Sequence, residues 1–311
     1  MSDLMMQVIK VNDYGGADQL RLESAARPIP QAEQVLVHMV AAGVHPADWK
    51  YRGGLYKAWM PLTFPWTPGL DGAGIVEEVG PGVTIFQPGQ AVYGRISGSY
   101  AEYAIAPAAD LIQKPANLSF DQAAAVPVGA MTAWGMVVDA AAIQPGQRVL
   151  VQGAAGGVGL FAVQLARWKG AHVIGTASAK NADFVRSLGA EQVIDYQAGP
   201  FEKAVHDVDV VLETVGGDIT ERSLHVLRPD GILVTVAGMP PEEQAKALGV
   251  RVARGGRPGP DVLRQISQLV ESEKIRPVIG TVFPLADAGK AQALGETGHG
   301  RGRIILHITD V

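Results

Sequence analysis

Short apolar runs separated by turn residues characterise roughly the first 120 residues of the chain. The runs have the length of β-strands and lie at residues 7–11, 34–41, 74–79, 91–93, 100–105 and 111–113. Between them the pattern is interrupted by pairs such as Pro81-Gly82 and Pro88-Gly89, which favour turns. This spacing predicts an antiparallel, barrel-like β domain.

The rhythm changes from Arg148 onward, where apolar runs alternate with helical stretches. The runs lie at 149–152, 172–175, 192–195, 208–212 and 232–236, and the helical stretches include 157–169 and 218–227. Such alternation indicates a parallel sheet covered on both faces. Strand-like runs return at 281–283 and 303–308. We therefore expect an α/β protein in which a doubly wound Rossmann domain, residues 122–278, is inserted into a β-rich domain formed by 1–121 and 279–311.

Charge and composition favour a small-molecule partner. The 311 residues carry a formal net charge of −5 and no run of consecutive basic residues, so neither nucleic acid nor a membrane surface is an expected partner. The uncharged stretch 123–138 contains Pro127, Gly129 and Gly135, and we expect a buried segment that falls short of a membrane span. Because the chain has no cysteine and its beginning lacks the pattern of a signal peptide, we expect a cytoplasmic protein.

The strongest motif is a glycine-rich turn between an apolar strand and a helix. A pyrophosphate approaches the backbone amides at such a helix N-terminus, and a side chain at Gly156 or Gly159 would hold it away or prevent close helix–strand packing. Glycine triads also occur in purely structural turns, but the strands that follow this one favour a dinucleotide site. The expected contacts are Gly153, Ala155, Gly156, Gly157, Val158 and Gly159.

The end of the second strand indicates which dinucleotide binds. NAD enzymes commonly place an acidic residue there, about 20 residues on, to accept hydrogen bonds from the ribose 2′-hydroxyl. Here no acidic residue lies between Gly159 and Asp183. The segment presents Thr176 and, where the phosphate should lie, the hydroxyl of Ser178, the ammonium of Lys180 and the amide of Asn181. These side chains suit the 2′-phosphate of NADP(H). Alternatively, Ser178 caps the next helix and Lys180 is simply solvated.

Tyr196 closes the third strand of the predicted sheet. Its ring could lie along the adenosine of the cofactor or could pack as an ordinary strand-end tyrosine. The sequence does not decide between these two interpretations.

Motifs along the whole chain resemble one family. They are Ala154-Ala155-Gly156-Gly157-Val158-Gly159, Leu188-Gly189-Ala190 running into Val193-Ile194-Asp195-Tyr196, Val215-Gly216-Gly217, Ala42-Gly43-Val44 through Asp48 to Arg52-Gly53, Pro68 to Val76, Phe283-Pro284-Leu285 and Gly302 to Leu306. In these residues the chain resembles the quinone oxidoreductases of the medium-chain dehydrogenase/reductase superfamily. The resemblance implies a GroES-like catalytic domain, a substrate cleft between the domains and a homodimer. It also implies cofactor contacts at Val215, Ala237 and Gly238.

The resemblance further implies that catalytic zinc is absent. Zinc-dependent relatives have a cysteine where His45 stands, a histidine-glutamate pair at Leu70-Asp71 and another ligand near Val128. A tetrahedral catalytic site needs three protein ligands, and only His45 and Asp71 offer any. Relatives of the quinone oxidoreductase branch usually have asparagine in place of His45, so this residue departs from the pattern.

The same resemblance assigns side chains to the substrate cleft. The expected set is His45, Lys50, Tyr51, Arg52, Tyr56, Trp66, Val126 and Thr132. We expect catalytic roles for His45, Tyr56 and Thr132, with Thr132 in a turn at 131–134 contacting the nicotinamide or its ribose. His45 could donate a proton to the reduced acceptor, or only cap the helix that begins at Pro46. Lys50 and Arg52 could equally be solvated charges on a helix face.

Without zinc to polarise a carbonyl, hydride transfer to an electron-poor acceptor is the natural chemistry. The leading hypothesis is an NADPH-dependent reductase of quinones or conjugated enones and alkenals. An enoyl-thioester reductase and a non-catalytic NADPH-binding regulatory module are the alternatives.

Overall fold

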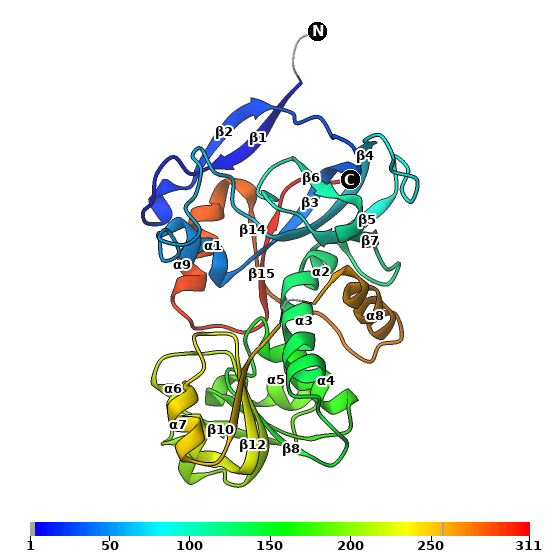
Figure 1. The fold of residues 1–311 in the computed structure, drawn as a ribbon. Coiled ribbons are helices and arrows are strands. Elements are labelled where there is room, and N and C mark those ends of the chain that lie inside the picture. The colour runs from blue at the N-terminus through cyan, green and yellow to red at the C-terminus, as the bar shows by residue number, and fades with distance from the viewer. Residues whose placement is uncertain (1–3, 257) are drawn as a thin grey trace. The chain divides into compact units, whose positions relative to one another are not determined.

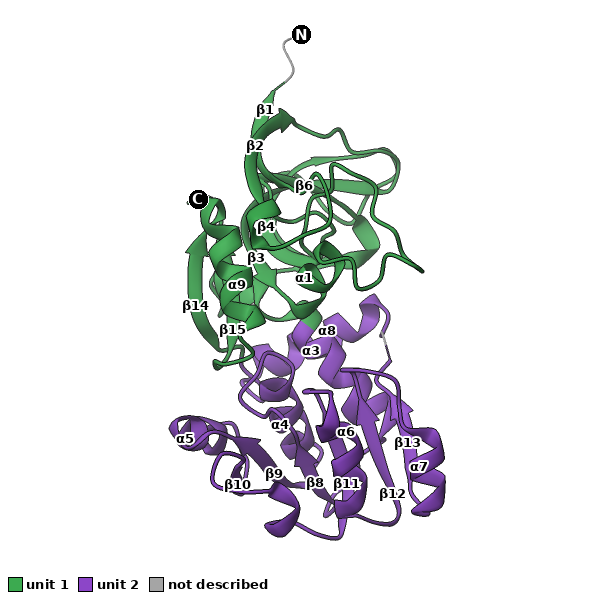
Figure 2. Cartoon of the chain, turned by 90° about the vertical axis from the view of Figure 1, so that its left-hand side faces the viewer, with its two compact units in different colours: residues 1–128, 277–311 green, residues 129–276 purple. Residues whose placement is uncertain are grey.

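The computed structural model describes residues 4–256 and 258–311 (Figure 1). It divides into two compact units (Figure 2): unit 1 takes the chain up to Val128 and again from Pro277, and unit 2 is Gly129–Arg276. The first boundary thus falls at 128 instead of the expected 121, because helix α2 (Phe120–Ala124) packs against strands β3 and β4 of unit 1. The second falls at 276 instead of 278.

Unit 1 is the β-rich unit, as the turn-rich pattern predicts. It contains an antiparallel pair, β1 (Met5–Lys10) and β2 (Arg21–Ala26), and a sheet in the order β14-β15-β3-β4-β5-β7 with β6 also paired to β3. The strands of that sheet are β3 (Gln34–Val44), β4 (Asp71–Val79), β5 (Ala91–Arg95), β6 (Tyr103–Pro107), β7 (Leu111–Gln113), β14 (Ile279–Pro284) and β15 (Arg303–His307). Strand β2, with no continuous apolar run, is missed by the sequence pattern.

Strand β3 is the centre of unit 1. It pairs with β4, β6 and β15 and is buried along most of its length. Its side chains Val35, Val37 and Met39 lie in one hydrophobic core, and Ala42 and Val44 lie in another. The antiparallel pairing of β15 with β3, Ile304 opposite Val44, returns the end of the chain to this unit. The expectation that the last strands rejoin the first domain is therefore confirmed.

Unit 2 is a parallel sheet accompanied by helices (Figure 2). Its strand order is β10-β9-β8-β11-β12-β13, so the direction of strand succession reverses between β8 and β11, which is the arrangement of doubly wound dinucleotide-binding domains. The strands are β8 (Arg148–Val151), β9 (His172–Ala177), β10 (Gln192–Asp195), β11 (Val208–Glu213), β12 (Leu227–Thr235) and β13 (Arg251–Arg254). The sequence pattern predicts the first five but misses β13, whose Arg-Val-Ala-Arg sequence has no apolar run.

The helices follow the expected physical signals. In α8 the buried residues Leu263, Ile266, Ser267 and Val270 form one stripe at helical spacing, and Pro260 occupies the first turn. The helices are α1 (Pro46–Arg52), α2, α3 (Pro127–Trp134), α4 (Gly159–Trp168), α5 (Ala182–Ser187), α6 (Asp218–Arg222), α7 (Glu242–Ala247), α8 (Pro260–Glu271) and α9 (Ala288–Glu296). Short 3₁₀ turns are η1 (Ala17–Gln19), η2 (Ala108–Asp110), η4 (Ala179–Asn181), η5 (Phe201–Lys203), η6 (Ser223–Val226) and η7 (Leu285–Asp287), and η3 (Gly135–Ala140) is a π-helix.

The apolar segment at 120–140 corrects two expectations. Its helical turns run from Phe120 to Ala140, which is long and apolar enough to cross a membrane, although it is mostly buried inside the protein like the core helix of a soluble protein. Residues 125–126 separate α2 from α3, and Pro127 begins α3, where proline is tolerated because it is the first residue of a helix. Thr132 consequently lies within α3 and not in a turn.

Candidate active site

The glycine-rich loop, residues 152–158, connects β8 to α4 in unit 2. Gly153 has a φ of +68°, a backbone conformation that favours glycine. A Cβ at Gly159 would lie 2.1 Å from the carbonyl oxygen of Gly153, so any other residue there would push the helix off the loop. These two glycines therefore set the turn from strand to helix, as the motif predicts.

The N-terminus of α4 leaves backbone donors free. The N–H of Gly156 donates to the carbonyl of Gly153 at 2.9 Å. Within the described residues, no acceptor is recorded for the next three N–H groups, those of Gly157, Val158 and Gly159. Free N–H groups at the positive end of a helix bind anions. The loop thus fits the pyrophosphate of a dinucleotide.

Thr176 supports this loop from β9. It is 3% exposed, its Oγ1 donates to Gln152 Oε1 at 2.7 Å, and the same oxygen accepts from the Gly153 N–H at 3.1 Å. The only proton of the hydroxyl is therefore used within the protein. Thr176 was expected to bind the cofactor, but its observed contacts are with the loop.

The three side chains expected at a 2′-phosphate differ in burial in the segment after β9. Ser178 and Asn181 are buried, with Asn181 Nδ2 3.4 Å from Ser178 Oγ. Ser178 is the N-cap residue of η4, but its side chain caps no backbone N–H, so the helix-cap interpretation is wrong. Lys180 is exposed. Its ammonium group is the positive charge of this segment that reaches solvent.

The remaining predicted cofactor contacts lie after neighbouring strands of the same sheet. Tyr196 follows β10 and is 50% exposed. Val215 follows β11 and is also exposed, and Ala237 and Gly238 follow β12. Since all these strands are parallel, their carboxyl ends bring the loops to the edge that carries the glycine-rich loop.

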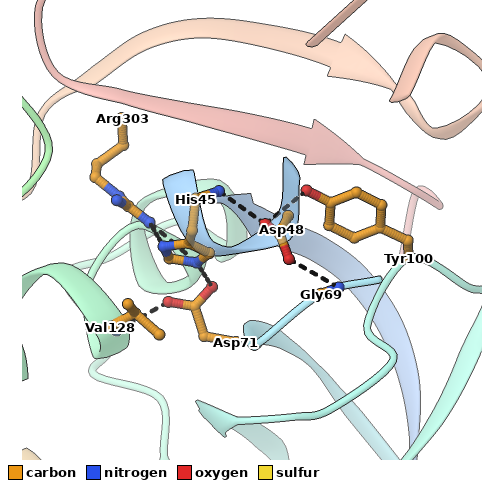
Figure 3. A network of polar contacts seen from close by, with 7 residues as sticks. All are labelled: His45, Asp48, Gly69, Asp71, Tyr100, Val128 and Arg303. Atoms are coloured by element: carbon orange, nitrogen blue, oxygen red, sulfur yellow. Dashed lines mark hydrogen bonds and ion pairs between the residues drawn. The ribbon is translucent and has the colours of Figure 1, made fainter. Parts of the chain in front are cut away.

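Unit 1 contains a buried polar network around His45 (Figure 3). The Nε2 atom of His45 lies 2.6 Å from Asp71 Oδ1, and Arg303 Nη2 lies 2.9 Å from His45 Nδ1. The other carboxylate oxygen, Asp71 Oδ2, accepts from the Val128 N–H at 2.9 Å. Because arginine only donates, the facing ring nitrogen accepts and the ring proton is on Nε2, directed at Asp71.

The ring of His45 is the group for which the sequence left two roles open, proton donor or helix cap. It is 2% exposed and makes no hydrogen bond to the helix backbone, although the residue is the N-cap of α1. The proton-donor hypothesis needs a free nitrogen, and both nitrogens have partners inside unit 1. A side chain of the helix instead bonds the N-cap backbone, because Asp48 Oδ2 accepts from the His45 N–H at 2.8 Å.

Burial and charge shift the ionisable groups of this network in different directions. Burial raises the pKa of the Asp71 carboxyl, but the contacts with His45 and Arg303 outweigh burial and hold that pKa below its ordinary value. Burial raises the pKa of Asp48, and it raises the pKa of Tyr100, whose hydroxyl donates to Asp48, well above the usual range. Burial lowers the pKa of Arg303. Asp71 is thus the carboxylate that the network holds in its charged form.

Arg52 is a structural residue and not a solvated charge on a helix face. It is 1% exposed, with Nε donating to Gln292 at 2.8 Å, Nη1 to the Gly15 carbonyl at 2.7 Å and Nη2 paired with Glu296. Its expected place in the substrate cleft is therefore wrong. Val126 is also fully buried.

The other expected cleft residues of unit 1 form an aromatic group. Tyr51 contacts Tyr56 edge to face, with ring centroids 5.1 Å apart, and its ring lies 6.4 Å from that of Trp66. Tyr56, Trp66 and Lys50 are half-buried, and Trp59 beside them is 78% exposed. An accessible aromatic surface of this kind suits a flat, conjugated molecule.

The positions that the resemblance relates to zinc ligands carry few side chains that could bind a metal ion. Leu70 has an aliphatic side chain, and Val128 contributes only its backbone N–H. His45 and Asp71 are bound to each other, and the cationic Arg303 lies against the ring. Across residues 4–256 and 258–311, no group of three His, Asp or Glu side chains is arranged to hold a metal ion.

Known proteins resemble the chain over nearly its whole length. Residues 31–116 match the alcohol dehydrogenase GroES-like domain, and residues 188–306 match a family model described as zinc-binding dehydrogenase. The chain is 34% identical to quinone oxidoreductase of Mus musculus over 96% of either protein. It is 35% identical to the chloroplastic NADPH-dependent alkenal/one oxidoreductase of Arabidopsis thaliana, over 95% of this chain and 78% of that one. The solved quinone oxidoreductase of Coxiella burnetii superposes with a TM-score of 0.91, at 34% identity, over 98% of this chain and 100% of that one.

A GroES-like β unit joined to a doubly wound sheet with a glycine-rich loop defines a medium-chain dehydrogenase/reductase, an oxidoreductase that uses a nicotinamide cofactor. Within this class, the chain belongs to the quinone oxidoreductase family, because relatives of that name match it at 34% identity over nearly their full length. The resemblance noted in the sequence and the expected fold class are both confirmed.

Sequence reasoning missed the buried polar residues that organise both units. In unit 1 these are Asp48 and Arg303, and in unit 2 they are Gln152 and Glu213, while Asp71 was named only as a possible metal ligand. The available signal was a charged or amide side chain inside or directly after an apolar strand, as in Val-Leu-Glu at 211–213. A buried polar group of that kind needs partners, but the sequence does not say which.

Proposed function

We propose that the chain is a zinc-independent, NADPH-dependent reductase of quinones or of conjugated enones and alkenals. Two features of unit 2 together carry the proposal. Backbone N–H groups at the start of α4 are free, and the segment after β9 has an exposed lysine and no carboxylate before Asp183. The first feature suits a pyrophosphate. The second suits a 2′-phosphate and would not repel it.

The residues at the former zinc positions support a metal-independent reaction. Arg303 places a permanent positive charge beside His45, and a divalent cation brought to the same position would be repelled. Substrates that need no Lewis acid are those whose conjugation already makes a carbon atom electron-poor. Quinones and enones have this property.

NADPH, when bound, supplies the hydride for such a reduction. The acceptor then carries negative charge on oxygen and needs one proton to complete the two-electron reduction. Tyr56, half-buried in the aromatic group, donates its phenolic proton to that oxygen and recovers it from water. Tyr51 and Trp66 hold the flat acceptor, and Thr132 contacts the nicotinamide riboside.

We also propose that the protein is cytoplasmic and forms a homodimer through the edges of two unit 2 sheets. The edge strand β13 (Arg251–Arg254) has unpaired backbone groups on one side within the sheet order, which suits pairing with a second copy. Light scattering of the purified protein tests the dimer.

The test of the function is NADPH oxidation with naphthoquinones, alkenals and acyl thioesters supplied separately. Turnover with quinones or alkenals is the expected result. Turnover confined to acyl thioesters would instead identify an enoyl-thioester reductase. Tight NADPH binding without turnover on any of the three would identify a regulatory binding module.

Tyr56→Phe tests the proton donor. It should lower kcat by about 10²-fold and leave the KM for NADPH unchanged. Tyr51→Phe is the matched control, since it removes a hydroxyl from the same aromatic group that already points at Met60 Sδ, 3.7 Å away. Equal activity in both variants would assign the proton to solvent.

A further inference from the structure

A fully buried carboxylate stands at the end of β11, where the sheet of unit 2 meets its loops. Glu213 is 0% exposed, and among the described residues it has no recorded ion-pair partner. Instead it accepts four hydrogen bonds from neutral donors. These come from the N–H of Val215 at 2.5 Å and of Gly216 at 2.7 Å to Oε1, and from the hydroxyls of Thr220 at 3.0 Å and Thr235 at 2.8 Å to Oε2.

Oε1 fixes the loop after β11. The two N–H groups that it accepts are consecutive, and the turn continues through Gly216 and Gly217 with φ of +87° and +65°. Consecutive N–H groups gathered on one anion in this way form a concave turn of defined shape. The carboxylate therefore determines where the exposed side chain of Val215 is held.

Oε2 fixes the loop after β12 through Thr235. Glu213 and Thr235 are register partners at the carboxyl ends of two parallel strands. Thr235 Oγ1 donates to Glu213 and also accepts from the Ala237 N–H at 3.1 Å. One carboxylate thus connects two loops, and these are the loops that carry Val215, Ala237 and Gly238.

Glu213 lies at the edge of the sheet where a dinucleotide is expected to bind. Strand order reverses between β8 and β11, and dinucleotides bind outside the carboxyl ends of strands at such a reversal. Thr214, the residue after Glu213, donates its hydroxyl to the carbonyl of Gln152 at 2.8 Å. The loops after β8, β11 and β12 are therefore linked by polar contacts at the point where the cofactor is expected.

We propose that Glu213 is a positioning residue for the dinucleotide, acting through Val215 N–H on one side and through Thr235 and Ala237 N–H on the other. A buried carboxylate is costly unless hydrogen bonds compensate it, and here its bonds go to the loops that would hold the cofactor. The proposal rests on dinucleotide binding by this unit. It does not depend on whether NADPH or NADH is preferred.

Two isosteric threonine variants test it, since each removes one hydroxyl from the same oxygen, Glu213 Oε2. Thr235→Val breaks the link to Ala237, whereas Thr220→Val removes a bond from α6, the helix that follows the loop after β11, and leaves the link to Ala237 intact. We expect Thr235→Val to raise the Kd for NADPH, measured by fluorescence titration, by about tenfold, or about 1.4 kcal/mol. Thr220→Val should stay within about twofold, although both variants should lose thermal stability.

Two further variants separate positioning from general stability. Thr235→Ser keeps the hydroxyl and should restore a Kd close to wild type even if its Tm is lowered by the missing methyl group. Glu213→Gln keeps the side-chain volume, but its amide NH₂ must face either the two N–H donors or the two hydroxyl donors. Its Kd for NADPH should therefore rise at least as much as that of Thr235→Val. In both Glu213→Gln and Thr235→Val the KM for NADPH should increase more than kcat falls.

Different results would overturn the positioning role of Glu213 and the proposed function. Equal Kd values in Thr235→Val and Thr220→Val, whether raised or unchanged, would overturn the positioning role while leaving the proposed function intact. A wild-type protein that binds neither NADPH nor NADH would overturn the proposed function itself. If the wild type binds only NADH, the same four variants are titrated with NADH and the same comparison applies.

Discussion

The ring Nε2 of His45 lies 2.6 Å from Oδ1 of Asp71, and both side chains are almost completely buried. Arg303, which lies 258 residues further along the chain, completes the contact on the other ring nitrogen. Gly43 leaves the necessary room, because a Cβ there would lie 2.3 Å from the same Asp71 oxygen. At the positions where zinc-dependent relatives hold metal ligands, this protein has a self-contained polar network.

His45→Ala should therefore mainly reduce stability. Removing one partner of a buried, charged contact leaves the other uncompensated, which typically costs about 3–5 kcal/mol. Urea denaturation should show this loss. His172→Ala is the control, since His172 pairs with Glu191 at the exposed surface and should lose less than about 1 kcal/mol. Unchanged stability of His45→Ala with a large fall in kcat would instead restore the proton-donor hypothesis.

Purified protein should contain no stoichiometric zinc, and chelators should leave its activity intact. The reason is that Leu70 and Val128 offer no ligand side chains while Arg303 faces His45. Elemental analysis of the protein and NADPH oxidation after dialysis against a chelator provide the measurement. One tightly bound zinc per chain, lost together with activity, would contradict the proposal.

NADPH should be preferred over NADH. One charge-assisted hydrogen bond contributes roughly 1.5–3 kcal/mol, so the contact of Lys180 with the 2′-phosphate would give a preference of at least about tenfold. Lys180→Ala should weaken NADPH binding by about tenfold and leave NADH binding nearly unchanged, because only the phosphate meets the lysine. Arg186→Ala, which removes an exposed cation paired with Asp183, is the matched control. Equal losses for both cofactors would mean that Lys180 is structural.

The contribution of His307 to stability should disappear at alkaline pH. The hydrogen bond to Asp121, 2.9 Å away, raises the pKa of His307 in the folded protein. A raised folded pKa means that the stabilisation is fully present below the unfolded value, about 6.5, and is lost as pH rises through the folded pKa. The difference in unfolding free energy between wild type and His307→Gln should therefore be larger at about pH 5.5 than at about pH 9.

Asp121→Asn provides the internal check on that prediction. In its background, His307→Gln should produce a much smaller change with pH, because the principal cause of the raised pKa is gone. A difference that grows with pH would contradict the assignment.

Much of the fold could be predicted because its signals are local. The apolar strands β8 to β12 and the turn at Gly153–Gly159 depend on residues within a few positions of one another. Strands without a local signal could not be found. β13, for example, is defined by its pairing with β12, Ile232 opposite Arg251, and its own sequence has no apolar run.

The sequence by itself determined the α/β architecture, the inserted domain and the glycine-rich loop, because hydrophobic period and glycine sterics act over short stretches of chain. Only the tertiary structure decided what the buried polar side chains do. Arg52 is buried and bonded on three sides instead of lying at the surface. His45 contacts Asp71 and Arg303, and Glu213 accepts a hydrogen bond from Thr235. A polar group inside a protein must find a partner, and long-range folding alone decides which partner lies within reach.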